Sequence, residues 1–230
     1  MKKNLIYLLN LLKTYQGISL LFFGLPISIL IRIISPIILI RIMHINAGRI
    51  GEFILNPAIY LYQKEYKINS TSQKSLDIFY LEEKVINSFL LKMLKRKINI
   101  GYTILLRPID NAQKLLDKIF NSGEKYKPFL NRKFKTHYID CFPYSKKNIN
   151  FTAKEIKRGK KELFEKFGID ENSKFVCFLI RDQAFLKKKY PSSNFDYHEY
   201  RNMKPQNFLS AAEELTKRGY YVFRMGKIQE

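Results

Sequence analysis

The chain has 230 residues, enough for one domain or one and a fraction, and its hydrophobic share of 46% suffices for a buried core. Its formal charge is +21, because it holds 41 Lys and Arg residues and only 20 Asp and Glu residues. Such an excess points to nucleic acid, an anionic membrane surface or an anionic substrate as the partner. No basic run is interleaved with aromatic residues as in a nucleic-acid-binding module, so we expect no nucleic acid partner.

The cysteines and histidines exclude further classes of protein. Two cysteines, Cys141 and Cys177, are too few for a disulfide framework or a zinc site. We expect Cys177, inside an apolar stretch, to be a small buried residue of a protein in a reducing compartment. His44, His137 and His198 lack the spacing of metal ligands, and the chain contains no Asp-x-Asp motif. We therefore expect no metal and no cofactor, and a structural role for His44 and His137.

Residues 1–35 are the most hydrophobic part of the chain. Lys2 and Lys3 come first, and residues 17–31 carry no charge but are interrupted by a Gly-Leu-Pro sequence. A membrane-spanning helix needs about 20 apolar residues, and no small-residue cleavage site of a signal peptide follows. Two interpretations stay open: a core helix, or an anchor that lies in the membrane interface or crosses once. We favour the anchor, because no downstream surface requires so much apolar cover.

Residues 36–150 alternate between strand and helix patterns, which predicts an α/β, Rossmann-like domain. The β-branched run 37–45 predicts its first strand, and residues 46–51 (NAGRIG) predict a tight glycine turn. Residues 53–64 predict a helix with Pro57 in its first turn. Strand, glycine turn and helix together bring backbone N–H groups to an anion, although such turns also occur for steric reasons alone.

Four further segments are predicted before a long surface loop at residues 131–150. They are a strand at residues 76–81, a helix at residues 82–97, a third apolar run at residues 98–106, and a helix at residues 108–120 that Asn121 ends.

Residues 151–230 begin with a predicted linker helix. Thr152 and Glu155 have the spacing of a capping box that starts this helix, and Gly168 ends it.

Residues 175–225 predict one βαβ unit. Its first strand is the apolar run 175–180, which reads as a buried parallel strand, and its helix begins at Pro205 and ends before Gly219. In open α/β sheets the ligand binds outside the carboxyl ends of the strands. Polar residues cluster there, at the strand end and in the loop that follows: Arg181, Asp182, Asp196, His198, Arg201 and Asn202.

The motifs of this βαβ unit, together with the glycine turn, resemble those of glycosyltransferases from bacterial surface-polysaccharide gene clusters, a family of GT-B type. The matches touch both halves of what would be a two-domain enzyme. They are Ile45 to Gly51 upstream and, in the βαβ unit, Arg181-Asp182, Tyr190-Pro191, Asp196-Tyr197-His198, Tyr200-Arg201-Asn202, Ala211 to Leu215, Gly219-Tyr220 and Arg224-Met225-Gly226.

The resemblance implies transfer of a sugar from a nucleotide-sugar donor to a glycan or lipid-linked acceptor, in surface-polysaccharide biosynthesis at the cytoplasmic face of the bacterial inner membrane. The partners would be these two substrates and the anionic membrane surface. A transfer without a metal needs a base for the acceptor hydroxyl and cations for the leaving diphosphate. The residues that the resemblance implies for donor and phosphate binding are Arg181, Asp182, Arg201, Asn202, Asn46, Gly48, Arg49 and Gly51.

His198 or Asp196 would be the catalytic base, and Glu52 is a third candidate. Relatives are expected to carry a His in the place of Glu52, although a carboxylate can also act as a base. Each group also has a purely structural interpretation. Glu52 is favourable in the first turn of a helix, Arg181 and Asp182 can form an ion pair at a strand end, and the loop around His198 can be a solvated surface loop.

The resemblance leads us to expect an incomplete second domain. A doubly wound domain needs on the order of 100 residues to cover both sheet faces, and residues 173–230 provide one βαβ unit. We expect a truncated reading frame, a split gene, or a terminal unit packed on the first sheet. The alternatives to an active transferase are a non-catalytic relative that keeps only a binding surface and, less favoured, a basic nucleic-acid-binding protein.

Overall fold

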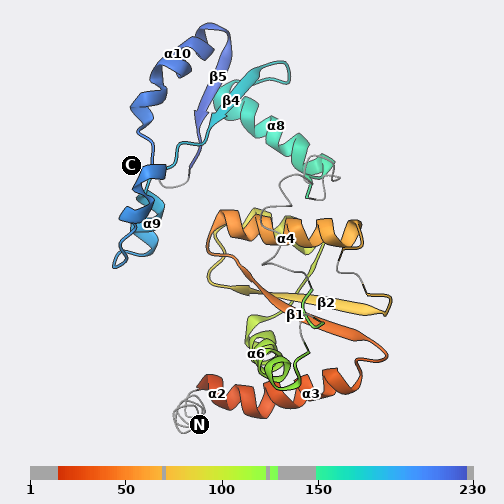
Figure 1. Ribbon diagram of the computed structural model, residues 1–230. Coiled ribbons are helices and arrows are strands. Elements are labelled where there is room, and N and C mark those ends of the chain that lie inside the picture. Colours follow the sequence, from red (N-terminus) through yellow and green to blue (C-terminus); the bar gives the residue numbers. More distant parts are fainter. Residues whose placement is uncertain (1–14, 69–70, 123–124, 129–148, 227–230) are drawn as a thin grey trace. The chain divides into compact units, whose positions relative to one another are not determined.

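The computed structural model describes residues 15–68, 71–122, 125–128 and 149–226. The chain divides into two compact units, Met1–Asn150 (unit 1) and Phe151–Glu230 (unit 2), and each has its own parallel sheet (Figure 1). Because both units combine helices with parallel strands, the α/β class predicted from the sequence is confirmed at this level.

Unit 1 is built on a three-stranded parallel sheet in the order β1-β2-β3. β1 (Leu39–Asn46) pairs along its whole length with β2 (Ser75–Glu82), and β3 (Asn99–Ile100) pairs over two residues with the other edge of β2. The register sets Asn46 opposite Glu82, so the first two strands end at the same edge. Side chains at this carboxyl edge are therefore neighbours.

Helices cover both faces of this sheet (Figure 1). α4 (Ile50–Glu65) and α5 (Ser88–Lys95) lie on one face, and α6 (Thr103–Phe120) lies on the other. Because strand side chains alternate between the faces, Ile45 packs under α4 and α5, while Tyr80 packs under α6. Each face of the sheet thus has its own hydrophobic core, as a parallel sheet requires.

A helical path before β1 packs along α6. It consists of α2 (Tyr15–Ser19), a π-helical turn η1 (Leu20–Gly24) and α3 (Leu25–Ile33). Ile31 belongs to the core between the sheet and α6, whereas other apolar side chains of the path are exposed. Among the described residues, no helix is both long and apolar enough to cross a membrane.

Two predicted elements of unit 1 have different bounds in the structure. The helix expected over residues 82–97 is α5 alone, because β2 continues to Glu82 and the side chain of Asn87 caps the helix by accepting a hydrogen bond from the Leu90 N–H. The apolar run 98–106 divides between β3 and the first turn of α6. Hydrophobicity alone does not separate a short buried strand from the start of a helix.

Pro57 lies in the interior of α4 rather than in its first turn, because the helix begins at Ile50. Proline at this position removes one helical hydrogen bond, and its fully buried ring contributes packing that offsets the loss. Asn121 ends α6 in the left-handed conformation, at φ 48°. The predicted loop at residues 131–150 lies almost entirely outside the described residues, and so do His137 and Cys141.

Unit 2 begins with the predicted linker helix. In α8 (Ala153–Phe167), the Thr152 hydroxyl accepts a hydrogen bond from the Glu155 N–H (3.2 Å), and the Glu155 carboxylate accepts one from the Thr152 N–H (2.9 Å). The capping box is therefore confirmed. Gly168 ends the helix at φ 67°, in the left-handed region that favours glycine.

The predicted βαβ unit follows. β4 (Lys174–Phe178) pairs in parallel with β5 (Tyr220–Arg224), and α10 (Leu209–Lys217) precedes β5. Gly219 makes the tight turn between α10 and β5 at φ 80°. The connection from β4 to α10 contains α9 (Ala184–Lys189) and the 3-10 turns η3 (Asp196–Arg201) and η4 (Pro205–Phe208).

The sheet of unit 2 is thinly covered. The Phe167 ring packs on Phe223 at 5.3 Å on one face, and the Phe208 ring packs on Phe178 at 5.7 Å on the other. Cys177 of β4 is exposed, which corrects the prediction of a buried residue. In the described part of unit 2, the sheet has only two strands, so β4 has an open edge. On the face of Cys177, the Phe167 ring of α8 packs on Phe223, the residue opposite Cys177 on β5.

Candidate functional site

The predicted glycine turn lies at the carboxyl edge of the unit 1 sheet. Asn46 is the last residue of β1, and its side chain organises the turn. Its Oδ1 accepts a hydrogen bond from the Gly48 N–H at 2.9 Å, and its Nδ2 donates one to Glu52 Oε2 at 2.8 Å. The structure thus brings three of the predicted site residues, Asn46, Gly48 and Glu52, into one hydrogen-bonded turn.

The other two predicted residues of this motif are at the start of α4. Arg49 is the N-cap residue, with an extended backbone and an exposed side chain. Gly51 lies in the first turn, where a Cβ would meet nothing within 4 Å. Neither Gly48 nor Gly51 has a positive φ, so the turn does not need glycine for its backbone conformation.

The first turn of α4 already holds a negative charge. The Glu52 carboxylate lies there, where the helix dipole stabilises an anion. A phosphate would have to share this position with that carboxylate. The geometry therefore favours an acid–base or hydrogen-bonding role for the turn over a phosphate cradle.

The same edge holds a group of titratable side chains that sequence reasoning did not connect. His44 Nε2 lies 3.4 Å from Glu82 Oε2, and His44 Nδ1 lies 4.0 Å from Asp110 Oδ2. Tyr80 and Lys114 each donate a hydrogen bond of 2.7 Å to Asp110 Oδ2. An imidazole, two carboxylates, a phenol and an ammonium group thus share one corner of unit 1, hereafter the His44 cluster.

The electrostatics of the His44 cluster keep Asp110 ionised. Burial alone would raise the pKa of the Asp110 carboxyl, but His44, Lys114 and the Tyr80 hydroxyl outweigh burial and lower this pKa below its ordinary value. Burial and the negative charge of Asp110 raise the pKa of Tyr80 well above its ordinary value, so the phenol keeps its proton. The His44 side chain is 36% exposed, so its imidazole reaches both a buried carboxylate and the solvent.

The positions of these residues along two consecutive strands could have predicted part of this cluster. His44 and Asn46 alternate along β1, and Tyr80 and Glu82 alternate along β2, so all four lie on one face at the ends of two consecutive parallel strands. Asp110 comes from α6 and is placed only by the packing of that helix on the sheet.

The carboxyl edge of the β4–β5 sheet holds the second candidate group. Asp182 Oδ2 accepts a hydrogen bond from Arg224 Nη2 at 2.8 Å, and Asp182 Oδ1 accepts one from the Ala184 N–H at 3.1 Å. Asp182 thus joins the ends of β4 and β5 and fixes the start of α9. These contacts support the structural interpretation of Asp182, with Arg224 in place of Arg181 as its partner.

Arg181 and Asn202 are on adjacent segments at this edge. The Met203 N–H donates to the Arg181 carbonyl at 2.9 Å, which joins the loop to the end of β4. Within the described part of the chain, the half-buried guanidinium of Arg181 has no hydrogen-bond or ion-pair partner, and Asn202 Oδ1 is buried without one. Polar groups without partners next to a strand end are what a polar ligand needs.

The remaining predicted residues of unit 2 lie on η3. Asp196 and Arg201 are exposed there. The turn is held by Phe195, a buried residue whose ring packs on Tyr190 at 6.0 Å. The side chain of His198 lies outside what the structure describes, so its catalytic role stays a prediction.

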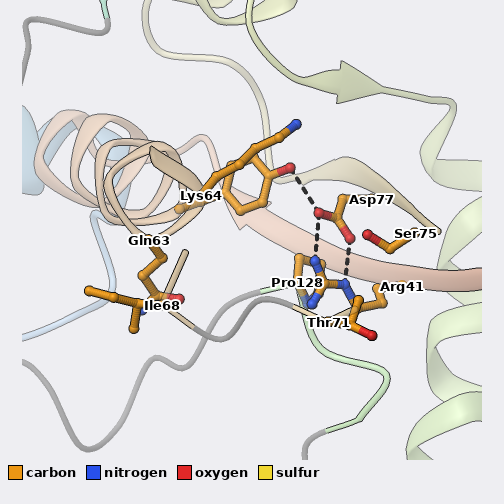
Figure 2. Close-up of a pocket in the computed structure, with 9 residues that line it drawn as sticks. Arg41, Gln63, Lys64, Ile68, Thr71, Ser75, Asp77 and Pro128 are labelled. Carbon is orange, nitrogen blue, oxygen red and sulfur yellow. Dashed lines mark hydrogen bonds and ion pairs between the residues drawn. The ribbon is translucent and has the colours of Figure 1, made fainter. Parts of the chain in front are cut away.

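A small polar cavity lies elsewhere in unit 1, near the amino ends of β1 and β2 (Figure 2). Its volume is about 100 Å³. Arg41 Nε and Nη2 bind the two carboxylate oxygens of Asp77 at 2.5 and 2.8 Å, and the Tyr60 hydroxyl donates to Asp77 Oδ2 at 2.9 Å. Because these groups bind one another, and because open α/β sheets bind ligands at the opposite edge, we interpret this network as structural.

Comparison with models of known protein families finds no match, and neither a curated protein nor a solved structure matches the chain significantly. The resemblance to glycosyltransferases therefore stays a prediction. Its structural support has to come from the residues at the carboxyl edges of the two sheets. Across the described residues, no group of three or more His, Cys, Asp or Glu side chains has an arrangement that could hold a metal ion.

Proposed function

We propose that the protein is a GT-B-type glycosyltransferase, which moves a sugar from a nucleotide-sugar donor to a glycan or lipid-linked acceptor at the cytoplasmic face of the bacterial inner membrane. The observation that carries the proposal is the pair of unpartnered polar groups at the carboxyl edge of the β4–β5 sheet. Open α/β sheets bind their ligands at this edge. The groups concerned, on Arg181 and Asn202, are among those that the sequence resemblance assigns to the donor.

In this proposal Arg181 binds the donor diphosphate. The neighbouring Arg224 is already held by Asp182 at 2.8 Å, whereas the Arg181 guanidinium has no such partner among the described residues. A guanidinium can make two parallel hydrogen bonds to phosphate oxygens, and its charge stabilises the diphosphate as it leaves. Asn202 adds an amide beside it, and Arg201 adds an exposed positive charge on η3.

The chemical step needs a group that accepts the proton of the acceptor hydroxyl. The hydroxyl oxygen forms the new bond to the anomeric carbon, the bond from that carbon to the diphosphate breaks, and the proton passes to the base. Asp196 and His198 lie in the same unit as the donor site and are the candidates for this base, and the role that the resemblance gives to Glu52 of unit 1 stays a prediction.

Calorimetric titration of the full chain with a panel of nucleotide sugars tests the donor site. We expect one class of donor to bind. Arg181→Ala should weaken its binding by roughly 1–3 kcal/mol, about fivefold to 150-fold in Kd, because a charge-assisted contact with phosphate is lost.

Arg218→Ala is the matched control. It removes an exposed arginine of the same unit, paired with Glu214 at 2.7 Å, at the amino end of β5. Its donor affinity should equal that of the wild type. If Arg181→Ala also binds like the wild type, Arg181 is structural, and if no nucleotide sugar binds, the proposed function is wrong. Turnover of the bound donor then separates an active transferase from a chain that only binds.

A further inference from the structure

The polar side chains of α3 face the protein rather than the solvent. Between residues 17 and 40 the only charged residue is Arg32. Its guanidinium turns toward α6 and donates a hydrogen bond to Asp117 Oδ1 at 2.6 Å. Ser28 is fully buried, and its hydroxyl donates to the Ile109 carbonyl at 3.0 Å. Both polar groups of this helix are thus used in packing on α6.

The outer side of the same helical path is apolar. Phe22 is 80% exposed and Ile33 is 68% exposed. Ile29 lies four residues before Ile33, on the same side of α3, and Leu30 and Ile37 are also exposed. A surface in water normally shows the opposite arrangement, with polar groups outside and apolar groups inside. An apolar face of this kind therefore indicates an interaction site.

Close packing on α6 restricts how the path can meet a partner. A Cβ at Gly24 would lie 2.4 Å from the carbonyl oxygen of Pro108, so only glycine allows this approach. Small residues such as Gly24 and Ser28 are what closely packed helices in membranes use. Because one side of the path contacts α6, lipid cannot surround it. The path can lie in the plane of a membrane interface but is not placed to cross the bilayer.

Positive charge borders the apolar face near the end of α3. Lys125 is exposed, and its ammonium lies 5.5 Å from the centre of the Tyr126 ring. The Arg32 guanidinium lies 4.5 Å from that same ring and 5.6 Å from the ring of Phe120, which is itself exposed. With a formal charge of +21 on the chain, a second copy is repelled, whereas an anionic bilayer complements both the apolar face and its cationic border.

We propose that the outer face of the N-terminal helical path docks unit 1 on an anionic lipid bilayer, with the path parallel to the membrane plane. This docking face is formed by Phe22, Ile29, Leu30, Ile33 and Ile37. Its side chains enter the boundary between headgroups and acyl chains, and the neighbouring Lys125 contacts lipid phosphates. The inference does not rest on glycosyl transfer, because docking needs neither donor nor acceptor.

Flotation with vesicles tests the docking face. We expect the full chain to bind vesicles of phosphatidylcholine mixed with phosphatidylglycerol, and to bind vesicles of phosphatidylcholine alone more weakly. The double variant Ile29→Asn, Ile33→Asn should lose about tenfold or more of its partition onto anionic vesicles, because two apolar side chains no longer leave water. Point substitutions are used because Ile31 of the same path belongs to the core, so deleting the path would disrupt unit 1.

Ile156→Asn is the matched control for this loss. Ile156 is 48% exposed on α8, and Ile29 is 49% exposed on α3, so the two substitutions change similar amounts of exposed apolar surface. We expect the control to partition like the wild type, within about twofold. Equal partition of the double variant and the wild type would overturn the proposal.

A single tryptophan measures the depth of docking, because the chain contains none. In Phe22→Trp, fluorescence should shift to the blue on addition of anionic vesicles and should be quenched by lipids brominated in their acyl chains. Phe164→Trp, at a residue 61% exposed on α8, should show neither effect. A shift without quenching, together with self-association in sedimentation that the double variant loses, would mean that a second copy covers the face instead of lipid.

Discussion

Units 1 and 2 are both built from β–α repeats around a parallel sheet, but their interiors differ. Unit 1 has two hydrophobic cores in which residues such as Ile45, Phe53 and Phe79 are completely buried. In unit 2 the helices α8, α9 and α10 have no buried residue at all. The buried residues of unit 2, among those described, are Ile169, Ile180, Gln183 and Phe195. We therefore expect unit 1 to carry most of the stability, and unit 2 to be held largely by local contacts.

The largest expected effect comes from the buried ion pair of unit 1. Asp77→Ala leaves Arg41 buried without its counter-charge and removes the acceptor of Tyr60, so it should lower the free energy of unfolding of unit 1 by about 3–5 kcal/mol. Hydrogen exchange at the amides of β1 and β2 measures this loss.

Asp182→Ala is the corresponding change in unit 2. It breaks the ion pair between Asp182 and Arg224. The side chains of this pair are 13% and 25% exposed, more than those of Asp77 and Arg41 in unit 1. A loss of about 1 kcal/mol is expected, read from the amides of β4 and β5. Equal losses in the two units would contradict the difference that we draw between their interiors.

The His44 cluster should make unit 1 sensitive to acid. The pKa of Asp110 is lowered in the folded state, so its ionisation stabilises the fold above the unfolded value of about 3.9, and this stability is lost as the pH falls through the lower folded value. Asp110→Asn should cost about 1.5–3 kcal/mol at neutral pH, because hydrogen bonds to a charged group are weakened.

The sign of the effect is tested by unfolding unit 1 at decreasing pH. The wild type should lose stability more steeply than Asp110→Asn below about pH 4, because only the wild type has to protonate this carboxylate. Glu162→Gln on α8 is the control: its pKa is also lowered, by Arg158, but it is exposed and in unit 2. Parallel pH profiles of the wild type and Asp110→Asn would show that the cluster does not stabilise the ionised carboxylate.

The same difference between the units decided what could be predicted from the sequence. The bounds of α8 and β5 depend on residues that act locally, such as the Thr152 cap and the turn at Gly219, and these were predicted closely. β4 ends at Phe178 instead of residue 180, and the helix predicted to begin at Pro205 begins at Leu209, after the 3-10 turn η4. In unit 1 the lengths of α5 and β3 depend on pairing with β2 and on packing, which no local pattern contains.

The candidate sites divide in the same way. The position of Asn46 at the end of β1 follows from the order of the elements and was predicted, whereas Arg181 lies beyond the end of β4 at Phe178 and not directly at it. The role of Asp182 as partner of Arg224 and the approach of His44 to Asp110 depend on contacts across 42 and 66 positions of sequence, and these were not predicted. Tertiary packing alone determines such contacts.

Glycine substitutions in the two units should have opposite signs. Gly24→Ala puts a methyl group 2.4 Å from the Pro108 carbonyl oxygen, which is backbone and cannot move aside cheaply, so unit 1 should lose about 1–3 kcal/mol. Gly159→Ala in α8 meets nothing within 4 Å and should stabilise unit 2 by about 0.5–1 kcal/mol, because alanine favours a helix. Thermal unfolding of both variants measures the two signs, and a loss in both would mean that α8 is packed more tightly than its exposure indicates.

Two helix caps, one in each unit, should differ in how far their loss spreads. Thr152→Ala removes the capping box of α8. Asn87→Ala removes the cap of α5, because the Asn87 side chain accepts a hydrogen bond from the Leu90 N–H at 2.9 Å. Each should cost about 1 kcal/mol.

Since α8 has no buried residue, the loss of its cap should raise hydrogen exchange in its own first turn and leave β4 and β5 unchanged. In α5, Leu90 belongs to the core, so the loss of the Asn87 cap should instead raise exchange throughout β1 and β2. If Thr152→Ala raises exchange in β4 and β5 as much as in α8, then unit 2 unfolds as one cooperative body, and its thin interior is stronger than its exposed side chains indicate.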